Sequence, residues 1–158
     1  MNDFPELLSR FGKAVADNDG AGLSALFTED GVYDDGFFGE YAGRAAIAGM
    51  LQHFHDTGSN FRWDFLDPLS GGDTGYARYR FSYASAMPGA EGKPVVFEGI
   101  AFFTFRGGLI ERYSEVFDRG MALAQQDFAP ERIKKVLVKL AARQNAGPGA
   151  KEHLARFG

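Results

Sequence analysis

Residues 75–117 read GYARYRFSYASAMPGAEGKPVVFEGIAFFTFRGGLIERYSEVF, and this stretch decides the fold. Large apolar residues alternate with polar ones through residues 76–83, a pattern typical of a strand whose two faces differ. Glycine-rich segments divide the stretch into three runs, and a similar run precedes it. We therefore predict four long strands joined as an antiparallel meander, over 61–69, 75–86, 94–105 and 109–117.

The residues before this meander predict helices. Apolar residues recur at helical spacing through residues 4–17, and shorter helices are expected over 22–27 and 44–56. Between them we expect a short strand at 32–34 and a loop rich in glycine and aromatic residues at 36–43. Helices followed by a run of strands predict an α+β fold, in which the N-terminal helices pack on one face of a curved antiparallel sheet.

The C-terminal segment differs from the rest of the chain in charge. Residues 1–130 contain 10 Lys/Arg and 19 Asp/Glu, whereas residues 131–158 contain 7 and 2. Pro130 opens a last helix with an apolar stripe and a basic stripe, which either docks on its own acidic body or contacts a partner. We expect one domain over 1–128, followed by a basic helix and tail over 129–158.

Composition excludes several classes of protein. With 158 residues and no cysteine, the chain is one domain without disulfides, thiolate metal sites or a cysteine nucleophile. Its acidic body argues against a nucleic-acid partner, because phosphates require a basic surface. The longest apolar run, residues 100–105, is too short to span a membrane, and residues 1–6 do not look like a signal peptide. We expect a soluble, cytoplasmic protein.

Aromatic residues are unusually frequent. The chain has 16 Phe, 6 Tyr and 1 Trp, which together make 15% of its residues. Aromatic side chains supply a large buried area for few rotatable bonds. They therefore either fill a core or line an apolar pocket, and the composition leaves both interpretations open.

Five short motifs carry a family resemblance. They are ALFTEDGVYDD at 25–35, GRAAI at 43–47, GLI at 108–110, EVFD at 115–118 and LAQ at 123–125. In this order and spacing they resemble the nuclear transport factor 2-like superfamily, which includes ketosteroid isomerases, SnoaL-like polyketide cyclases, scytalone dehydratase and limonene epoxide hydrolase. The resemblance covers about residues 4–128. It implies a cone-shaped domain, an apolar pocket between helices and sheet, commonly a homodimer, and no metal or organic cofactor.

Three carboxylates are candidates for acid–base chemistry. The resemblance to ketosteroid isomerases places the general base at Asp35; a carboxylate at the mouth of an apolar pocket has a raised pKa and can move a proton next to a carbonyl. The alternative is a carboxylate that caps a turn or pairs with Arg44. Asp118 matches an aspartate of the cyclases and epoxide hydrolase, or else caps the helix that begins near Arg119. Glu115 is a third candidate if its side of the last strand faces the pocket.

The sequence also departs from the family patterns. Ketosteroid isomerases use a tyrosine and a protonated aspartic acid as oxyanion donors, and the gapless match puts Phe11 and Ala101 at those positions. Because neither side chain donates a hydrogen bond, we do not expect the usual isomerase mechanism, unless Tyr33, Tyr41, Tyr113 or Trp63 supplies a donor from elsewhere. The epoxide hydrolase pattern needs Arg-x-Asp on a strand, whereas residues 78–80 read RYR.

Alternation along the last strand admits two arrangements. Either Phe117, Glu115 and Tyr113 face the pocket, or Asp118, Val116 and Ser114 do; we favour the first because small residues on the neighbouring strand suit a pocket wall. The expected lining is Phe11, Tyr33, Phe38, Tyr41, Phe54, Trp63, Ala101, Phe103, Tyr113 and Phe117.

Two classes of function follow from these residues and the resemblance. The first is an enzyme of the isomerase, cyclase or dehydratase type that moves a proton on an apolar carbonyl compound. The second is a non-catalytic ligand-binding or dimeric protein-interaction module with the same fold.

Overall fold

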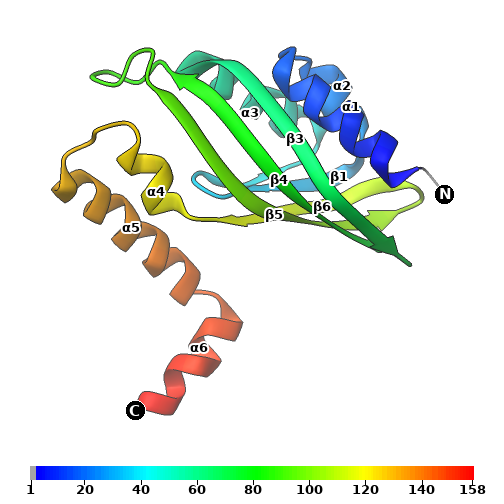
Figure 1. The fold of residues 1–158 in the computed structure, drawn as a ribbon. Coiled ribbons are helices and arrows are strands. Elements are labelled where there is room, and N and C mark those ends of the chain that lie inside the picture. The colour runs from blue at the N-terminus through cyan, green and yellow to red at the C-terminus, as the bar shows by residue number, and fades with distance from the viewer. Residues whose placement is uncertain (1–2) are drawn as a thin grey trace.

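Residues 3–158 are described by a computed structural model, so the first two residues of the segment considered for a signal peptide lie outside it. Helices precede a run of long strands, and the α+β fold is confirmed (Figure 1). The elements in chain order are α1 (Phe4–Ala16), α2 (Gly20–Ala25), β1 (Phe27–Asp35), β2 (Gly39–Ala42), α3 (Arg44–Thr57), β3 (Gly58–Gly71), β4 (Thr74–Ser85), β5 (Pro94–Arg106), β6 (Leu109–Phe117), α4 (Arg119–Ala124), α5 (Pro130–Asn145), α6 (Pro148–Leu154) and a 3-10 turn at Ala155–Phe157.

The sheet has six strands in the order β2-β1-β6-β5-β4-β3. Strands β3 to β6 form the predicted antiparallel meander, but β1 pairs in parallel with β6, so the sheet is mixed rather than wholly antiparallel. The register shifts between Phe27 and Val32, where the polar segment Thr28–Gly31 interrupts the alternation. That interruption explains why the pattern predicted only residues 32–34 as strand.

A hairpin replaces the loop expected at residues 36–43. Strand β2 pairs antiparallel with the end of β1, with Tyr33 opposite Tyr41 and Asp35 opposite Gly39. Four residues are too few to show a strand period, so the pairing was not visible in the sequence. The hairpin fixes the carboxyl end of β1 next to the turn at residues 36–38.

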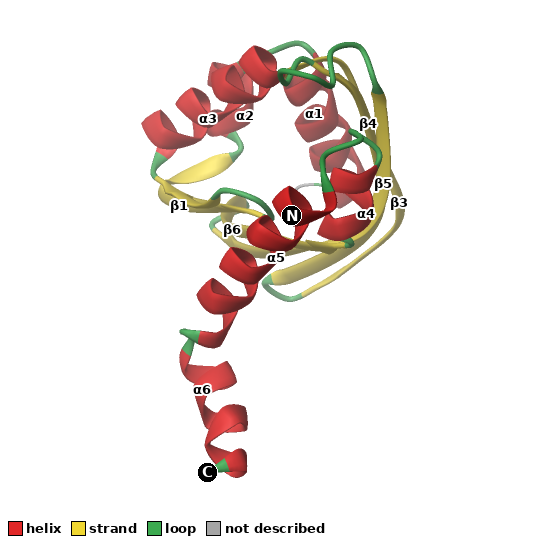
Figure 2. Ribbon diagram, turned by 90° about the vertical axis from the view of Figure 1, so that its left-hand side faces the viewer, coloured by secondary structure: helices red, strands yellow, loops and turns green. Residues whose placement is uncertain are grey.

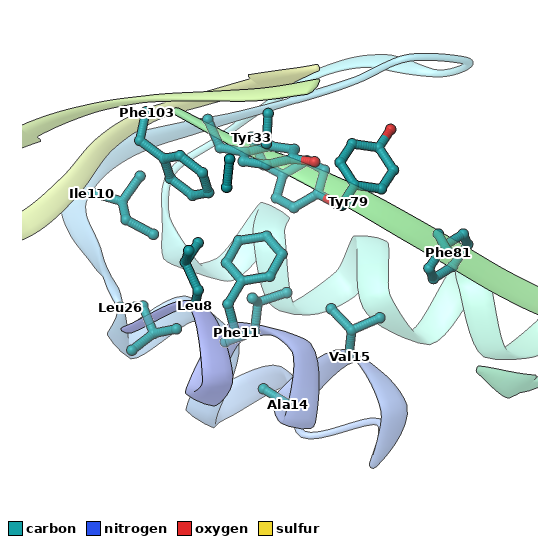
Figure 3. Close-up of a cluster of buried hydrophobic side chains, with 14 of the residues drawn as sticks. Leu8, Phe11, Ala14, Val15, Leu26, Tyr33, Tyr79, Phe81, Phe103 and Ile110 are labelled. Carbon is teal, nitrogen blue, oxygen red and sulfur yellow. The ribbon is translucent and has the colours of Figure 1, made fainter. Parts of the chain in front are cut away.

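The three N-terminal helices cover the inner face of the curved sheet (Figure 2). Helix α1 buries one apolar face, and Phe11 on that face is fully buried. The ring of Phe11 lies 5.3 Å from Trp63 and 5.2 Å from Tyr113, measured between centroids, and it points between helix and sheet (Figure 3). Such aromatic contacts contribute beyond the area that they bury, so much of the aromatic content fills the core.

The outer face of the sheet carries the alternate residues. Ile100 is 53% exposed and Val116 is 73% exposed on this face. Arg78 and Arg80 also lie outside, where they pair with Asp67 and Glu98. The alternation in β4 therefore sends arginines to solvent and tyrosine and phenylalanine inward, as a sheet with one covered face requires.

Helices α5 and α6 leave the body of the protein as an arm (Figures 1 and 2). None of their residues is buried. Residues Pro148–Leu154, within the predicted C-terminal tail, form helix α6. No helix within residues 3–158 is both long and apolar enough to cross a membrane.

Candidate active site

A cavity of about 600 Å³ lies between the sheet, helix α3 and the C-terminal helices. Aromatic rings make up most of its wall, and two carboxylates, Asp35 and Glu115, share it. The cavity is lined by Tyr33, Asp35, Phe37, Phe38, His53, Phe54, Thr57, Phe61, Trp63, Tyr79, Phe81, Tyr83, Met87, Phe97, Glu115, Phe117, Leu123, Gln126, Phe128, Arg132, Val136, Lys139, Leu140 and Arg143.

Half of the residues predicted to line the pocket lie on this wall: Tyr33, Phe38, Phe54, Trp63 and Phe117. The others lie elsewhere. Four of these are buried in the core, and Tyr41 is half-buried against it. Period-two alternation identifies the inward face of a strand but not how far along the strand the core ends and the cavity begins. The four core residues are Phe11, Ala101, Phe103 and Tyr113.

Asp35 ends β1 and is 7% exposed. Its Oδ1 accepts hydrogen bonds from the backbone amides of Phe37 and Phe38, each at 2.9 Å, and so closes the turn. Burial raises the pKa of Asp35, the two amides lower it in part, and the charges of Asp34 and Arg143 add small opposite effects. The carboxylate therefore caps a turn and also faces the cavity.

The expected ion pair between Asp35 and Arg44 is absent from the described residues. Arg44 instead pairs with Glu29 and donates to the carbonyl of Phe27. Oδ2 of Asp35 forms no hydrogen bond within residues 3–158. This oxygen is therefore the one free to act on a ligand in the cavity.

Glu115 lies on the inward face of β6 and is held by three donors. Its Oε1 accepts from the amide of Gly36 at 3.1 Å, and its Oε2 accepts from the hydroxyls of Tyr113 at 2.7 Å and Tyr79 at 2.9 Å. Burial and the nearby charge of Asp35 together raise the pKa of Glu115 to about 7, although its hydrogen bonds act in the opposite direction. A carboxyl with a pKa near 7 exchanges its proton close to neutral pH, and the charge of Asp35 influences that exchange.

Two further donors are available in the wall. The hydroxyl of Tyr33 and the indole Nε1 of Trp63 are buried and have no hydrogen-bond partner within residues 3–158. Burial raises the pKa of Tyr33, Tyr79 and Tyr113, so all three phenols stay protonated at neutral pH. An unpartnered buried donor costs free energy.

The two positions that lack a donor in the sequence have donors beside them in the fold. Ala101 is opposite Glu115 in the register of β5 and β6, so the carboxyl of Glu115 lies beside position 101 on the neighbouring strand. Phe11 contacts Trp63 edge to face, and its ring stacks on Tyr33 at 6.0 Å. The donor groups are therefore supplied by neighbours of the two substituted positions.

Asp118 does not belong to this group. Its side chain accepts from the amide of Met121 at 2.9 Å and caps helix α4, and the residue is exposed. The structure brings Asp35 and Glu115 together and leaves Asp118 outside the cavity wall. A helix N-terminus satisfies an aspartate well, which accounts for its position.

Several lining residues were not predicted, and two examples show why. The hydroxyl of Tyr79 donates a hydrogen bond to Glu115, and the alternation with Arg78 and Arg80 already marks Tyr79 as inward-facing. Helix α5 supplies Arg132, Val136, Lys139, Leu140 and Arg143, which line the open side of the cavity. The basic stripe of α5 was visible in the sequence, but its position beside the cavity was not.

No group of three or more His, Asp or Glu side chains within residues 3–158 is arranged to hold a metal ion. The site consists instead of two carboxyls, phenol and indole donors, and apolar rings.

Helices on the inner face of a curved six-stranded sheet, with a cavity between them, define a protein of the nuclear transport factor 2-like superfamily. Within this superfamily the chain belongs to the SnoaL-like domain family, whose profile matches residues 8–113. No curated protein matches the chain.

Three solved structures illustrate the likeness. A hypothetical protein with a ketosteroid isomerase-like fold from Catenulispora acidiphila DSM 44928, in complex with trimethylamine, has a TM-score of 0.71 and 22% identity over 80% of this chain and 98% of its own. A candidate polyketide cyclase from Xanthomonas campestris pv. campestris has a TM-score of 0.64 and 26% identity over 77% and 95%. An LEH-like epoxide hydrolase from M. tuberculosis has a TM-score of 0.63 and 17% identity over 87% and 94%. The first and third of these likenesses concern the fold alone.

Proposed function

We propose that the protein is a proton-transfer enzyme that acts on an apolar, carbonyl-bearing small molecule. The observation that carries this proposal is the pair of carboxyls, Asp35 and Glu115, in one aromatic cavity, with the pKa of Glu115 raised to about 7. Two titratable groups whose environments differ can divide acid and base work. Isomerases, cyclases and dehydratases of this kind share one first step, which is removal of a proton next to a carbonyl.

Asp35 is the base in this proposal. Its Oδ2 takes the proton from the carbon beside the carbonyl, and the electron pair of the broken C–H bond moves onto the carbonyl oxygen as an enolate. The hydrogen bonds from the backbone amides of Phe37 and Phe38 to Oδ1 hold the carboxylate in one orientation during the transfer. Positioned bases of this type typically contribute about 10²–10⁴ in rate.

Glu115 and Trp63 stabilise the enolate oxygen. Protonated Glu115 donates a hydrogen bond, and the indole Nε1 of Trp63 is a second donor in the same wall. Donors that are oriented before the reaction stabilise developing charge more strongly in an apolar cavity than in water. The proton on Asp35 then returns to a carbon of the enolate. Alternatively, the enolate carbon attacks a second carbonyl, the new alkoxide takes the proton of Glu115, and the proton on Asp35 passes to Glu115 to restore the site.

The resemblance to a candidate polyketide cyclase at 26% identity supports the enzymatic interpretation. The composition of the wall supports an apolar ligand, since rings outnumber polar groups around the cavity. A carbonyl is the feature that the unpartnered donors of Tyr33 and Trp63 would accommodate.

The first experiment identifies the ligand and then follows proton removal directly. Native mass spectrometry of the purified protein, followed by denaturing extraction, identifies a co-purified compound and gives its class. Deuterium uptake from D₂O at the carbon beside its carbonyl then reports abstraction without knowledge of the final product. We expect Asp35→Asn to slow uptake by about 10²–10⁴ while the ligand still binds.

The matched control is Asp118→Asn, which makes the same change outside the cavity and should exchange at the wild-type rate. Equal uptake in Asp35→Asn and wild type would contradict the enzyme proposal. It would leave a pocket protein that binds without chemistry, which is the alternative function.

We also propose that the protein is a homodimer. The outer face of the sheet supports this, because Ile100, Val116, Tyr76 and Val96 leave an apolar surface exposed there. Large exposed apolar patches usually mark interaction sites. Sedimentation velocity of wild type and Val116→Asp tests it: we expect a dimer that the charge dissociates, whereas a wild-type monomer at micromolar concentration would contradict it.

A further inference from the structure

Helix α5 brings three cations to the open side of the cavity. Arg132, Lys139 and Arg143 line this side, and all three are exposed. Helix α5 lies outside the matched family region, which ends at residue 113.

These cations differ from most arginines of the body. Within residues 3–158, six of the eight body arginines form ion pairs with carboxylates, whereas Arg10, Arg119 and the three α5 cations do not. The chain is acidic overall, so carboxylate partners are abundant. The paired body residues are Arg44, Arg62, Arg78, Arg80, Arg106 and Arg112.

Local contacts hold two of the three cations in place without neutralising them. The guanidinium of Arg132 lies over the ring of Phe128 at 3.8 Å from its centroid. Arg143 reaches the carbonyls of Gly36 and Phe37 only at 3.4 Å, which is long for a hydrogen bond. Their charges therefore remain available to a ligand.

The interior of the cavity has the opposite charge. Asp35 and Glu115 lie on its wall, so an anion placed deep inside would meet two carboxyls. A ligand with one charged end would bind with that end among the α5 cations and its apolar body among the rings. Guanidinium groups suit a compact oxyanion such as a carboxylate.

We propose that the substrate carries an anionic oxygen group that binds at the row of cations formed by Arg132, Lys139 and Arg143, while its apolar, carbonyl-bearing part fills the aromatic cavity. This inference rests on the proposed function and specifies its substrate class. It also assigns a role to the C-terminal arm, as the part of the chain that selects a charged apolar molecule over a neutral one.

A pair of fluorescent probes tests the proposal. 8-Anilinonaphthalene-1-sulfonate and N-phenyl-1-naphthylamine share one apolar body and differ by the anionic sulfonate. Trp63 is the single tryptophan of the chain and lines the cavity, so energy transfer from Trp63 to the probe reports binding near it. Titrations use the full chain and compare wild type with Arg132→Gln/Lys139→Gln.

We expect the double variant to bind the sulfonate probe roughly tenfold more weakly, while the neutral probe changes by less than about twofold. Added salt should weaken the binding of the sulfonate probe and leave the binding of the neutral probe unchanged. Lys134→Gln is the matched control for each single variant, because Lys134 is on the opposite side of α5 and its replacement also removes one positive charge. Its affinities should equal those of wild type, and circular dichroism should show all variants folded.

Three results would overturn the inference. They are equal weakening of both probes, no weakening beyond that of Lys134→Gln, and no energy transfer to the sulfonate probe in wild type. Each is distinct from failure of the proposed function, which depends on deuterium uptake by Asp35→Asn. The single variants Arg132→Gln and Lys139→Gln should each give an intermediate loss, which keeps the test informative if the double variant is unstable.

Discussion

Replacing Glu115 by glutamine should change how stability depends on pH. The folded protein raises the pKa of Glu115 from its ordinary value of 4.5 to about 7, mainly because the carboxyl is buried and secondly because Asp35 is near. Folding therefore binds a proton between these two values. The favourable contribution is complete below about pH 4.5 and is lost as pH rises through about 7.

The expected size follows from the two pKa values. For one group that titrates at 4.5 when unfolded and at about 7 when folded, linkage predicts that the free energy of unfolding falls by about 2–3 kcal/mol between pH 5 and pH 8. A glutamine cannot ionise, so this loss is absent from Glu115→Gln. Relative to wild type, the free energy of unfolding of the variant should rise by about 2–3 kcal/mol over that range, whatever constant offset the substitution causes.

Urea denaturation at half-unit pH steps measures this difference. Each protein is unfolded between pH 5 and pH 8, and the free energies of unfolding are subtracted at each pH so that contributions from groups outside the Asp35–Glu115 pair cancel. Glu152→Gln is the matched control, because Glu152 is exposed on α6 and its loss removes the same charge away from the cavity. We expect its curve to run parallel to that of wild type.

Parallel curves for Glu115→Gln and wild type would refute the reasoning. They would mean that Glu115 ionises in the fold as easily as in the unfolded chain, and that the acid role proposed for it has no basis. A gain in the opposite direction, with the variant losing stability as pH rises, would refute it as well.

Three further substitutions test other parts of the site. A Cβ at Gly99 would lie 2.5 Å from the hydroxyl of Tyr79, so Gly99→Ala should lower the free energy of unfolding by about 1–3 kcal/mol and displace that hydroxyl. Urea denaturation measures the first effect, and the ultraviolet spectrum of the tyrosines measures the second. Phe11→Ala should lower the free energy of unfolding by about 3–5 kcal/mol in the same denaturation assay, because the ring is fully buried; a change near zero would contradict its place in the core. Arg143→Gln removes a charge that lowers the pKa of Asp35, so the acid limb of the deuterium-uptake profile should move to higher pH, and an unmoved limb would contradict this.

The four long strands could be predicted because their alternation is strong and their turns are rich in glycine. Strand β2 and the parallel pairing of β1 with β6 could not, since the first is four residues long and the second joins distant parts of the chain. A local pattern carries no information on which strands become neighbours across a crossover. The mixed character of the sheet was therefore invisible in the sequence.

The sequence identified the carboxylates of the candidate site better than it identified which residues line the cavity. The resemblance to ketosteroid isomerases selected Asp35, and the favoured face of the last strand selected Glu115; both line the cavity, whereas the third candidate, Asp118, does not. Phe103 and Tyr113 also face inward, yet they lie in the core. Alternation along a strand shows which side chains face inward, but not at which residue the packed core gives way to the cavity. The basic face of α5 was visible too, but only the tertiary structure brings Arg143 close enough to influence Asp35.

The parallel pairing of β1 with β6 also bears on how the protein folds. Strands β3 to β6 are joined by short connections, so their pairing closes small loops and is expected early. The amide of Gly36 and the carboxylate of Glu115 are 79 residues apart in the chain and meet only when β1 docks on this meander. Desolvation of the two carboxyls therefore belongs to a late folding event. Before this event the meander is formed, the cavity is not, and Asp35 and Glu115 are still solvated and apart. Mutations in the carboxyl pair should therefore change the rate of unfolding more than the rate of the early folding steps.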